Sequence, residues 1–402
     1  MNTLGFISNW LYMFNDVRTD RDLIVLDQRG VGYSEPSLNC PEAEEQWFQD
    51  WTQNLSMKES DQHYAKALQA CHDRLVSEGI NLSAYTSAAN AADVEDLRKA
   101  LGYSQWNIYG GSYGTKLALT IMRDYPEGVR SVILDSAYPL QANLYAGPSN
   151  SLRSLNRIFE RCAADTDCNQ AYPDLEATFY NLVDQLDTEP PILNLYDALN
   201  FKFYKVVLNG DRFIWTIFQM LYDTGQLPGL PRRIYEIKEG KTDLLFTSLQ
   251  SYIFFDGYWA EGMYFSIQCN EEAPFGSIDA TKSANANLSP RILEATNSLQ
   301  IYEYCAAWVE SQPSPKENEA VVSDIPTLIL SGEFDPVTPP AWGQLAAETL
   351  SNSQFLEFPG FGHWVYGTGA CDSQIVLDFI NDPDTPVDAN CINALGLKFV
   401  TE

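Results

Sequence analysis

A serine flanked by glycines could serve this chain as a nucleophile. The pentapeptide GGSYG places Gly110, Gly111 and Gly114 around Ser112 and matches the pattern Gly-x-Ser-x-Gly. Glycines at these positions let the backbone take the strained turn that lifts a serine hydroxyl out of a sheet. A helix starting directly behind the serine would favour developing negative charge. Because the pattern also occurs by chance in glycine-rich turns, its context in the chain decides between the two interpretations.

A serine hydroxyl needs a base at neutral pH, and the chain offers three histidines. His63 and His72 lie in a stretch rich in Glu and Gln upstream of the serine, where a solvated or packing histidine is expected. His363 lies in GFGHW after the last predicted strand, where a loop would bring it over the carboxyl edge of a sheet. We therefore predict His363 as the base.

The third member of such a site orients the imidazole and stabilises its charged form. Asp335, in GEFDPVTP at the end of the predicted strand TLIL, has the required chemistry and place. It precedes His363 by 363 − 335 = 28 residues, enough for one helix and one strand. Glu333 and Asp135 are rival acids. The order Ser, Asp, His is that of α/β-hydrolases and excludes the chymotrypsin and subtilisin orders.

Strands and helices alternate around these residues. The predicted elements, read from apolar runs and helical spacing, are a helix over 90–101 ended by Gly102, a strand over 106–109, a helix after the serine, a strand over 129–135, a strand over 327–330, a helix over 341–350, a strand over 355–360 and a helix over 373–380. This alternation predicts an α/β fold with a mostly parallel sheet and helices on both faces.

An earlier apolar run, DLIVLD over residues 22–27, predicts one more buried parallel strand. The loop after it carries Gly30 and Gly32. This is not a dinucleotide fingerprint, because Glu35 occupies the position of the third glycine. A tight turn beside a pocket is the better interpretation.

The predicted organisation is a catalytic domain divided by an insertion. Residues 1–137 and 312–402 show the strand and helix alternation, whereas residues 138–311 lack it, are rich in Tyr, Phe and Leu, and include helical stretches such as DRFIWTIFQMLYDTG. We interpret the insertion as a helical lid whose apolar face lines the pocket.

Composition excludes several classes of partner. The 54 acidic residues exceed the 25 basic ones and give a formal net charge of −29, which would repel nucleic acid. Such acidity is typical of a solvated surface, and it could also weakly attract cationic substrates such as peptide amines. Neither an apolar run long enough to span a bilayer nor a metal-ligand cluster is visible, so we expect no membrane span, no metal and no organic cofactor.

The eight cysteines are an even number without paired CxxC clusters, which favours disulfides over zinc. Order along the chain favours neighbouring pairs, namely Cys40 with Cys71, Cys162 with Cys168, Cys269 with Cys305 and Cys371 with Cys391. Oxidised pairs would place the protein in the periplasm or outside the cell, whereas free buried thiols would fit a cytosolic enzyme. No signal peptide is visible in residues 1–20.

Four motifs together resemble the proline iminopeptidase and tripeptidyl aminopeptidase branch of the α/β-hydrolases. They are GGSYGTKLA, DQRGVGYSEP, GEFDPVTPP and GFGHW, and the resemblance runs from about Arg21 to the C-terminus. It implies a serine exopeptidase that releases residues from the free N-terminus of short peptides. It also implies that lid carboxylates pair with the substrate ammonium, for which Glu271 and Glu272 are candidates. An exposed acidic pair is the alternative for these two residues.

The chain departs from this family at its N-terminus. The family begins with several strands and a glycine-rich loop that donates one oxyanion N–H group, and neither is visible here. Only the N–H of Tyr113 is assignable to the oxyanion hole. We therefore expect that part of the native N-terminus is missing, and that the gap closes, or is filled by residues 1–20 or another chain. A carboxylesterase on small esters and a catalytically weak ligand-binding protein remain alternative functions.

Overall fold

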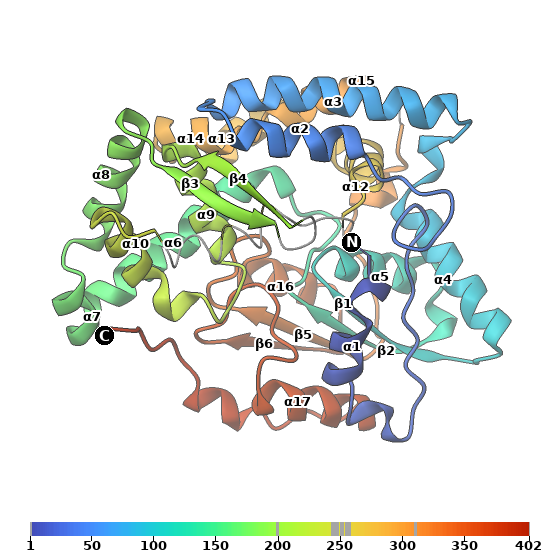
Figure 1. The fold of residues 1–402 in the computed structure, drawn as a ribbon. Coiled ribbons are helices and arrows are strands. Elements are labelled where there is room, and N and C mark those ends of the chain that lie inside the picture. The colour runs from blue at the N-terminus through green and yellow to red at the C-terminus, as the bar shows by residue number, and fades with distance from the viewer. Residues whose placement is uncertain are drawn as a thin grey trace.

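A four-stranded parallel sheet lies at the centre of the catalytic part of the chain. The computed structural model describes residues 2–197, 201–242, 249, 253, 259–308 and 312–401. The sheet has the order β1-β2-β5-β6 and comprises β1 (Trp106–Gly111), β2 (Val129–Asp135), β5 (Thr327–Gly332) and β6 (Ser353–Phe358) (Figure 1). The predicted α/β fold with a parallel sheet is confirmed.

Helices precede, connect and follow these strands. In chain order they are α1 (Ile7–Met13), α2 (Pro41–Trp51), α3 (Met57–Ser77), α4 (Ser87–Leu101), α5 (Tyr113–Asp124), α6 (Gly147–Ala164), α7 (Thr166–Ala171), α8 (Leu175–Thr188), α9 (Gly210–Met220), α10 (Leu230–Lys238), α12 (Glu261–Ile267), the π-helix η7 (Gln268–Glu272), α13 (Ile278–Ala284), α14 (Pro290–Thr296), α15 (Gln300–Trp308), α16 (Pro340–Ala347) and α17 (Ala370–Asn381).

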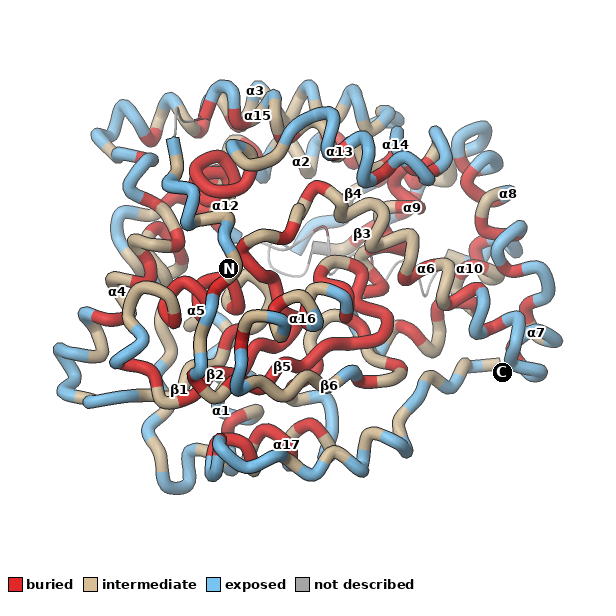
Figure 2. The backbone as a smooth tube through the Cα atoms, turned by 180° about the vertical axis from the view of Figure 1, so that it is seen from behind, coloured by how far each residue is buried: buried red, intermediate tan, exposed pale blue. Residues whose placement is uncertain are grey.

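The two faces of the sheet are buried by different helices, as the near-continuous apolar strands require. On β2, Val132 and Leu134 point to one face, where they pack with apolar residues of α5 and α16. Ile133 points to the other face and packs with residues of α17 and with Phe14. Figure 2 shows the two middle strands, β2 and β5, as largely buried. The helices on both faces hold the carboxyl ends of the strands in fixed positions.

The prediction of a strand over residues 22–27 is wrong. This segment has no regular secondary structure and pairs with no strand among the described residues, so β1 is an edge strand of the sheet. A strand needs a hydrogen-bonding neighbour, and the described residues before it form helices instead. The carboxylate of Asp27 binds the backbone N–H groups of Thr3 and Leu4 at 2.6 and 3.0 Å. The segment therefore ties the N-terminal turns to the body of the protein.

Helix α1 covers part of the face of the sheet that α17 also covers. Trp10 and Phe14 pack against Tyr109 of β1, with ring centroids 6.1 and 5.3 Å apart. Phe14 also packs against Tyr366, 5.0 Å away, and the hydroxyl of Tyr366 donates to the backbone oxygen of Met13 at 2.7 Å. Residues before the first predicted strand therefore contribute a helix to this face rather than another strand.

The insertion between β2 and β5 has its own apolar core and lies above the sheet in Figure 1. Besides helices it contains the antiparallel hairpin of β3 (Ile192–Asp197) and β4 (Lys202–Val207), which was not predicted although Leu193 and Leu195 alternate with Asn194. Helices α2 and α3, from the N-terminal part, pack with α12 and α15 of the insertion. The domain boundaries at 137 and 311 remain predictions.

The four predicted disulfides are confirmed. They join Cys40 to Cys71, Cys162 to Cys168, Cys269 to Cys305 and Cys371 to Cys391. The bond from Cys269 fastens the π-helix η7 to α15, and the bond from Cys371 fastens the start of α17 to the C-terminal segment. Among the described helices, none is long and apolar enough to cross a membrane.

Candidate active site

A sharp turn between β1 and α5 carries Ser112. Its backbone has φ 54° and ψ −124°, a conformation that a non-glycine residue rarely adopts. The two preceding glycines permit the turn, because a Cβ on Gly110 would lie 2.3 Å from the backbone oxygen of Gly114, and one on Gly111 would lie 2.7 Å from the Trp364 ring. A Cβ on Gly114 would meet nothing within 4 Å. The turn thus needs the first two glycines for steric reasons, whereas the space around Gly114 would accommodate a side chain.

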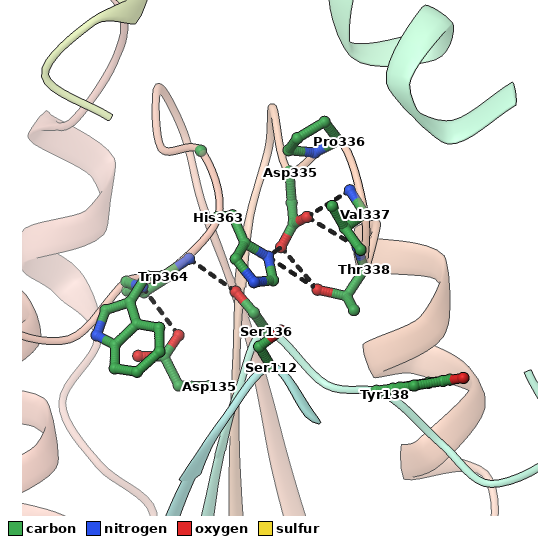
Figure 3. Close-up of polar contacts among 12 residues, drawn as sticks. Ser112, Asp135, Ser136, Tyr138, Asp335, Pro336, Val337, Thr338, His363 and Trp364 are labelled. Atoms are coloured by element: carbon green, nitrogen blue, oxygen red, sulfur yellow. Dashed lines mark hydrogen bonds and ion pairs between the residues drawn. The ribbon is translucent and has the colours of Figure 1, made fainter. Parts of the chain in front are cut away.

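Asp335 and His363 form a buried pair over the same end of the sheet. Oδ2 of Asp335 accepts a hydrogen bond from Nδ1 of His363 at 2.8 Å (Figure 3). The backbone N–H groups of Val337 and Thr338 donate to Oδ1 at 2.9 and 2.8 Å, and the Thr338 hydroxyl donates to Oδ2 at 2.8 Å. Asp335 is fully buried, so these donors replace water around its charge. The carboxylate is fixed in one orientation.

The imidazole of His363 is oriented by this pair. Burial opposes its charged form, but the neighbouring Asp335 carboxylate outweighs that effect, and the pKa of His363 is raised above its ordinary value. Its described hydrogen bonds use Nδ1 and the backbone N–H, which donates to the oxygen of Tyr222 at 3.0 Å. Nε2 therefore remains available to the hydroxyl of a nucleophile.

Helix α6 of the insertion is hydrogen-bonded to the loop that carries Asp335, the candidate acid. Arg153 donates to the backbone oxygens of Glu333 and Asp335 at 3.2 and 2.9 Å, and the Ser154 hydroxyl donates to that of Asp335 at 2.9 Å. Asn150 donates to the backbone oxygen of Val337 at 3.0 Å. Side chains of one helix face thus satisfy the carbonyl groups of this loop, and the insertion helps to position Asp335.

The two rival acids have other partners. Glu333 binds Arg157 and Arg161 of α6, the latter at 2.6 Å, and accepts from the N–H of Gly360 at 3.0 Å. Asp135, at the end of β2, accepts the backbone N–H groups of the loop that follows His363. Neither carboxylate contacts the imidazole ring in a described hydrogen bond, and this geometry favours Asp335 as the acid.

Tyr113 begins helix α5 directly after Ser112, the candidate nucleophile. The first N–H groups of a helix have no partner within it, so the N–H of Tyr113 is suited to an oxyanion. Its side chain points into the protein, where the phenol hydroxyl and Oγ of Ser87 are 2.9 Å apart. This partly buried contact ties the first turn of the helix to the start of α4.

The predicted amine-binding carboxylates lie in the π-helix η7 and are both buried. Glu272 forms an ion pair with Lys116 of α5, and burial lowers the pKa of that lysine to about 8. Glu271 accepts the backbone N–H of Ser87 through Oε1, while Oε2 has no hydrogen-bond partner among the described residues. Burial raises the pKa of Glu271. An unsatisfied carboxylate oxygen therefore belongs to Glu271, and Glu272 is neutralised within the protein.

We expect the Lys116→Met variant to lose about 3 to 5 kcal/mol of stability, because it leaves the Glu272 carboxylate buried without its partner. The double variant Lys116→Met/Glu272→Leu removes both charges, and it should recover most of that loss. Urea unfolding of both variants and of Glu272→Leu measures the coupling. Losses that simply add would show that the two side chains do not interact.

His63 and His72 lie apart from the site, on α3. Nδ1 of His63 contacts Asp50 at 2.8 Å and Nδ1 of His72 contacts Asp73 at 3.0 Å, as side chains in a packed or solvated helix do. Thr338 and Lys116 were not predicted from the sequence. The spacing of Thr338, three residues after Asp335, is that of a local turn and could have suggested the contact. No local signal marks Lys116, whose partner is 156 residues away.

Two family models match the chain. The model described as "alpha/beta hydrolase fold" matches residues 4–234, and a model described as "TAP-like protein" matches residues 292–391, which include Asp335 and His363. The first match spans more than half of the chain, and the two together cover all three residues of the predicted site.

Three curated relatives agree with these matches. Serine protease Hip1 of Mycobacterium tuberculosis is 24% identical over 394 residues, which are 92% of this chain and 74% of that protein. Proline iminopeptidase of Xylella fastidiosa is 38% identical over 61 residues (15% and 20% of the two chains), and tripeptidyl aminopeptidase of Streptomyces lividans is 30% identical over 120 residues (29% and 22%). The predicted resemblance is confirmed, and the chain belongs to the α/β-hydrolase fold family.

Proposed function

We propose that the protein is a serine exopeptidase that releases N-terminal residues from short peptides through an acyl-enzyme on Ser112. The observation that carries the proposal is the buried Asp335–His363 pair, held over the sheet edge from which the strained Ser112 turn projects. The peptidase names of the three relatives support amide bonds as the substrate class.

The first half of the reaction forms the acyl-enzyme. The Ser112 hydroxyl attacks the peptide carbonyl carbon while Nε2 of His363 takes its proton, and Asp335 stabilises the resulting imidazolium. The carbonyl oxygen becomes negative and is bound by the N–H of Tyr113 at the start of α5. His363 then gives the proton to the leaving amine, the C–N bond breaks, and the shortened peptide departs.

The second half of the reaction restores the enzyme. A water molecule attacks the ester carbon, and His363 again takes the proton. The tetrahedral intermediate collapses, the proton returns to Oγ of Ser112, and the N-terminal residue or short peptide leaves as a carboxylate. No step of this sequence needs a metal or an organic cofactor.

The lid carboxylate Glu271 is our candidate for recognising the free amine of the substrate. Its Oε2 atom has no hydrogen-bond partner among the described residues, and its neighbour Ser87 contacts Tyr113, the residue after the nucleophile. A substrate ammonium beside Oε2 would satisfy the carboxylate and favour its charged form. This arrangement would select peptides with a free N-terminus.

The proposal is tested with three substrates. We would measure kcat/KM for an alanyl or prolyl arylamide, its N-acetylated twin and a short acyl ester, and repeat the arylamide series with a tripeptidyl substrate. Turnover that requires the free amine supports the exopeptidase. Turnover of the ester alone, indifferent to the amine, would identify a carboxylesterase, and silence on every substrate would favour a ligand-binding protein.

We expect Glu271→Gln to lower kcat/KM for free-amine substrates by about 10- to 100-fold, because one charge-assisted hydrogen bond of about 1.5 to 3 kcal/mol is lost. The acetylated twin has no charged amine and should be unaffected. Glu272→Gln is the matched control: its carboxylate is paired with Lys116, so the ratio of free-amine to acetylated turnover should stay unchanged. Equal ratios in all three proteins would remove Glu271 from the amine site.

The cysteines indicate the compartment in which the enzyme works, and the insertion indicates how its site is covered. The four disulfides are consistent with an oxidising compartment, and we propose that the protein works in the periplasm or outside the cell. We also propose that residues 138–311 act as the lid over the site, and that short peptides, rather than nucleic acids, are its partners.

A further inference from the structure

The backbone of the loop that follows His363 is hydrogen-bonded to two side chains: Asp135, the last residue of β2, and Ser136, the residue after it. The backbone N–H of Trp364 donates to Oγ of Ser136 at 2.9 Å. The next two N–H groups, of Val365 and Tyr366, donate to Oδ1 and Oδ2 of Asp135, each at 2.9 Å. Three successive backbone N–H groups after His363 thus donate to the side chains of two adjacent residues, the last residue of β2 and the one after it. Figure 3 shows Trp364 beside Asp135 and Ser136. We call these two acceptors, Asp135 and Ser136, the loop latch.

The latch is buried and braced. Asp135 and Ser136 are fully buried, and Oδ2 of Asp135 also accepts the hydroxyl of Tyr109 at 2.8 Å. The Trp364 ring packs against Trp10 of α1 and Tyr109 of β1, with centroids 5.8 and 6.1 Å apart. A carboxylate with three donors in a dry setting is a strong and directional acceptor.

The backbone around the latch is strained. Trp364 has φ 83° and Ser136 has φ 61°, in the region that non-glycine residues avoid. Such conformations cost about 1 to 3 kcal/mol each and persist only where the surroundings over-determine them. The latch supplies that constraint for Trp364, the residue that immediately follows the base.

We infer that Asp135 is a positioning residue for His363: by fixing the loop amides behind the imidazole, it sets the orientation of the base. Asp335 orients the imidazole ring through Nδ1, and Asp135 fixes the backbone directly after His363. This inference rests on the proposed triad, and it assigns the former rival acid a separate function in the same reaction.

Asp135 also acts on the base through its charge. Burial raises the pKa of Asp135 to about 6. The negative charges of Asp335 and Asp135 together raise the pKa of His363. Among the described residues, Tyr222 also faces the imidazole: its ring lies 5.2 Å away, and burial raises its pKa. Removing the charge of Asp135 should therefore lower the pKa of His363.

The test is Asp135→Asn. The asparagine side chain has the same volume as the aspartate. One of the two accepting oxygens becomes an NH₂ group, which is a donor and cannot accept the N–H of the loop. We expect kcat to fall about 10- to 100-fold with KM unchanged, as a small misplacement of a catalytic group does. The acid limb of the pH profile of kcat/KM should move to lower pH, because His363 stays neutral further down.

Asp372→Asn is the matched control. This buried aspartate also accepts two N–H groups of the same loop, those of Gly367 and Thr368 at 2.7 and 3.3 Å, but it lies further from the base along the chain. It should lower stability without moving the acid limb. If Asp135→Asn does not fold, Ser136→Ala removes only the acceptor of the Trp364 amide, and it should lower kcat by a smaller factor at constant KM.

The outcomes separate this inference from the proposed function. Active protein is counted by titration with a fluorophosphonate, so a folding loss does not imitate a loss of kcat. An Asp135→Asn enzyme with normal kcat and an unmoved acid limb would overturn the positioning role while leaving the triad intact. If the proposed function itself is wrong, the Ser112→Ala variant keeps full activity.

Discussion

Ser112→Ala is expected to lower kcat by about 10⁴- to 10⁶-fold, because it removes the hydroxyl that forms the acyl-enzyme in the proposed mechanism. Binding should persist, since the variant removes one hydroxyl and leaves His363, the Tyr113 N–H and Glu271 in place. The remaining activity would come from an activated water and from stabilisation of the oxyanion. KM for a peptide arylamide should therefore change little.

The measurement is covalent labelling as well as turnover. A fluorophosphonate should label the native chain once, at Ser112, and should not label Ser112→Ala. Ser136→Ala is a stringent control, because Ser136 also has positive φ and also follows a strand of the sheet, but its hydroxyl accepts the amide of Trp364 in a buried site. It should keep its label. Labelling of Ser112→Ala at another serine would contradict the assignment.

The parts of the site that could be predicted from sequence are those whose signal is local. The turn at Ser112 needs glycines within two residues of it, and the order of serine, acid and base follows from the order of the strands. The pairing of neighbouring cysteines is local in the same sense. These predictions required no knowledge of how distant segments pack.

Contacts between distant segments could not be predicted. The strand at residues 22–27 looked apolar enough to be buried, but a strand also depends on a neighbour, and the sequence pattern does not show one. Similarly, Glu271 and Glu272 are equivalent in the sequence. Only the folded structure pairs Glu272 directly with Lys116 and leaves Oε2 of Glu271 without a hydrogen-bond partner among the described residues.

The choice among the three acids illustrates the same limit. Asp135, Glu333 and Asp335 all lie at or after the ends of strands of one sheet. The spacing to His363 favours Asp335 as the acid, but it predicts no role for the other two. In the structure each carboxylate has a different set of donors: loop amides for Asp135, arginines of α6 for Glu333, and the imidazole for Asp335. The distinction lies in the donors, which come from segments far away in the sequence.

Asp335→Asn therefore tests the assignment most sharply, and we expect it to lower kcat by about 10⁴-fold. Oδ1 of Asp335 accepts the N–H groups of Val337 and Thr338, so the oxygen of an asparagine must stay on that side. Its NH₂ group then faces Nδ1 of His363 as a donor. The imidazole must accept there, its proton moves to Nε2, and the base can no longer take a proton from Ser112.

Glu333→Gln and Asp135→Asn complete the comparison on the same substrate. Glu333→Gln weakens the contacts to Arg157, Arg161 and Gly360 and should lower stability while keeping kcat within a few-fold of the native value. Asp135→Asn should fall between the two. If Asp335→Asn stayed active while Asp135→Asn lost about 10⁴-fold, the carboxylate at the end of β2 would be the acid of the triad, and Asp335 would only hold the loop.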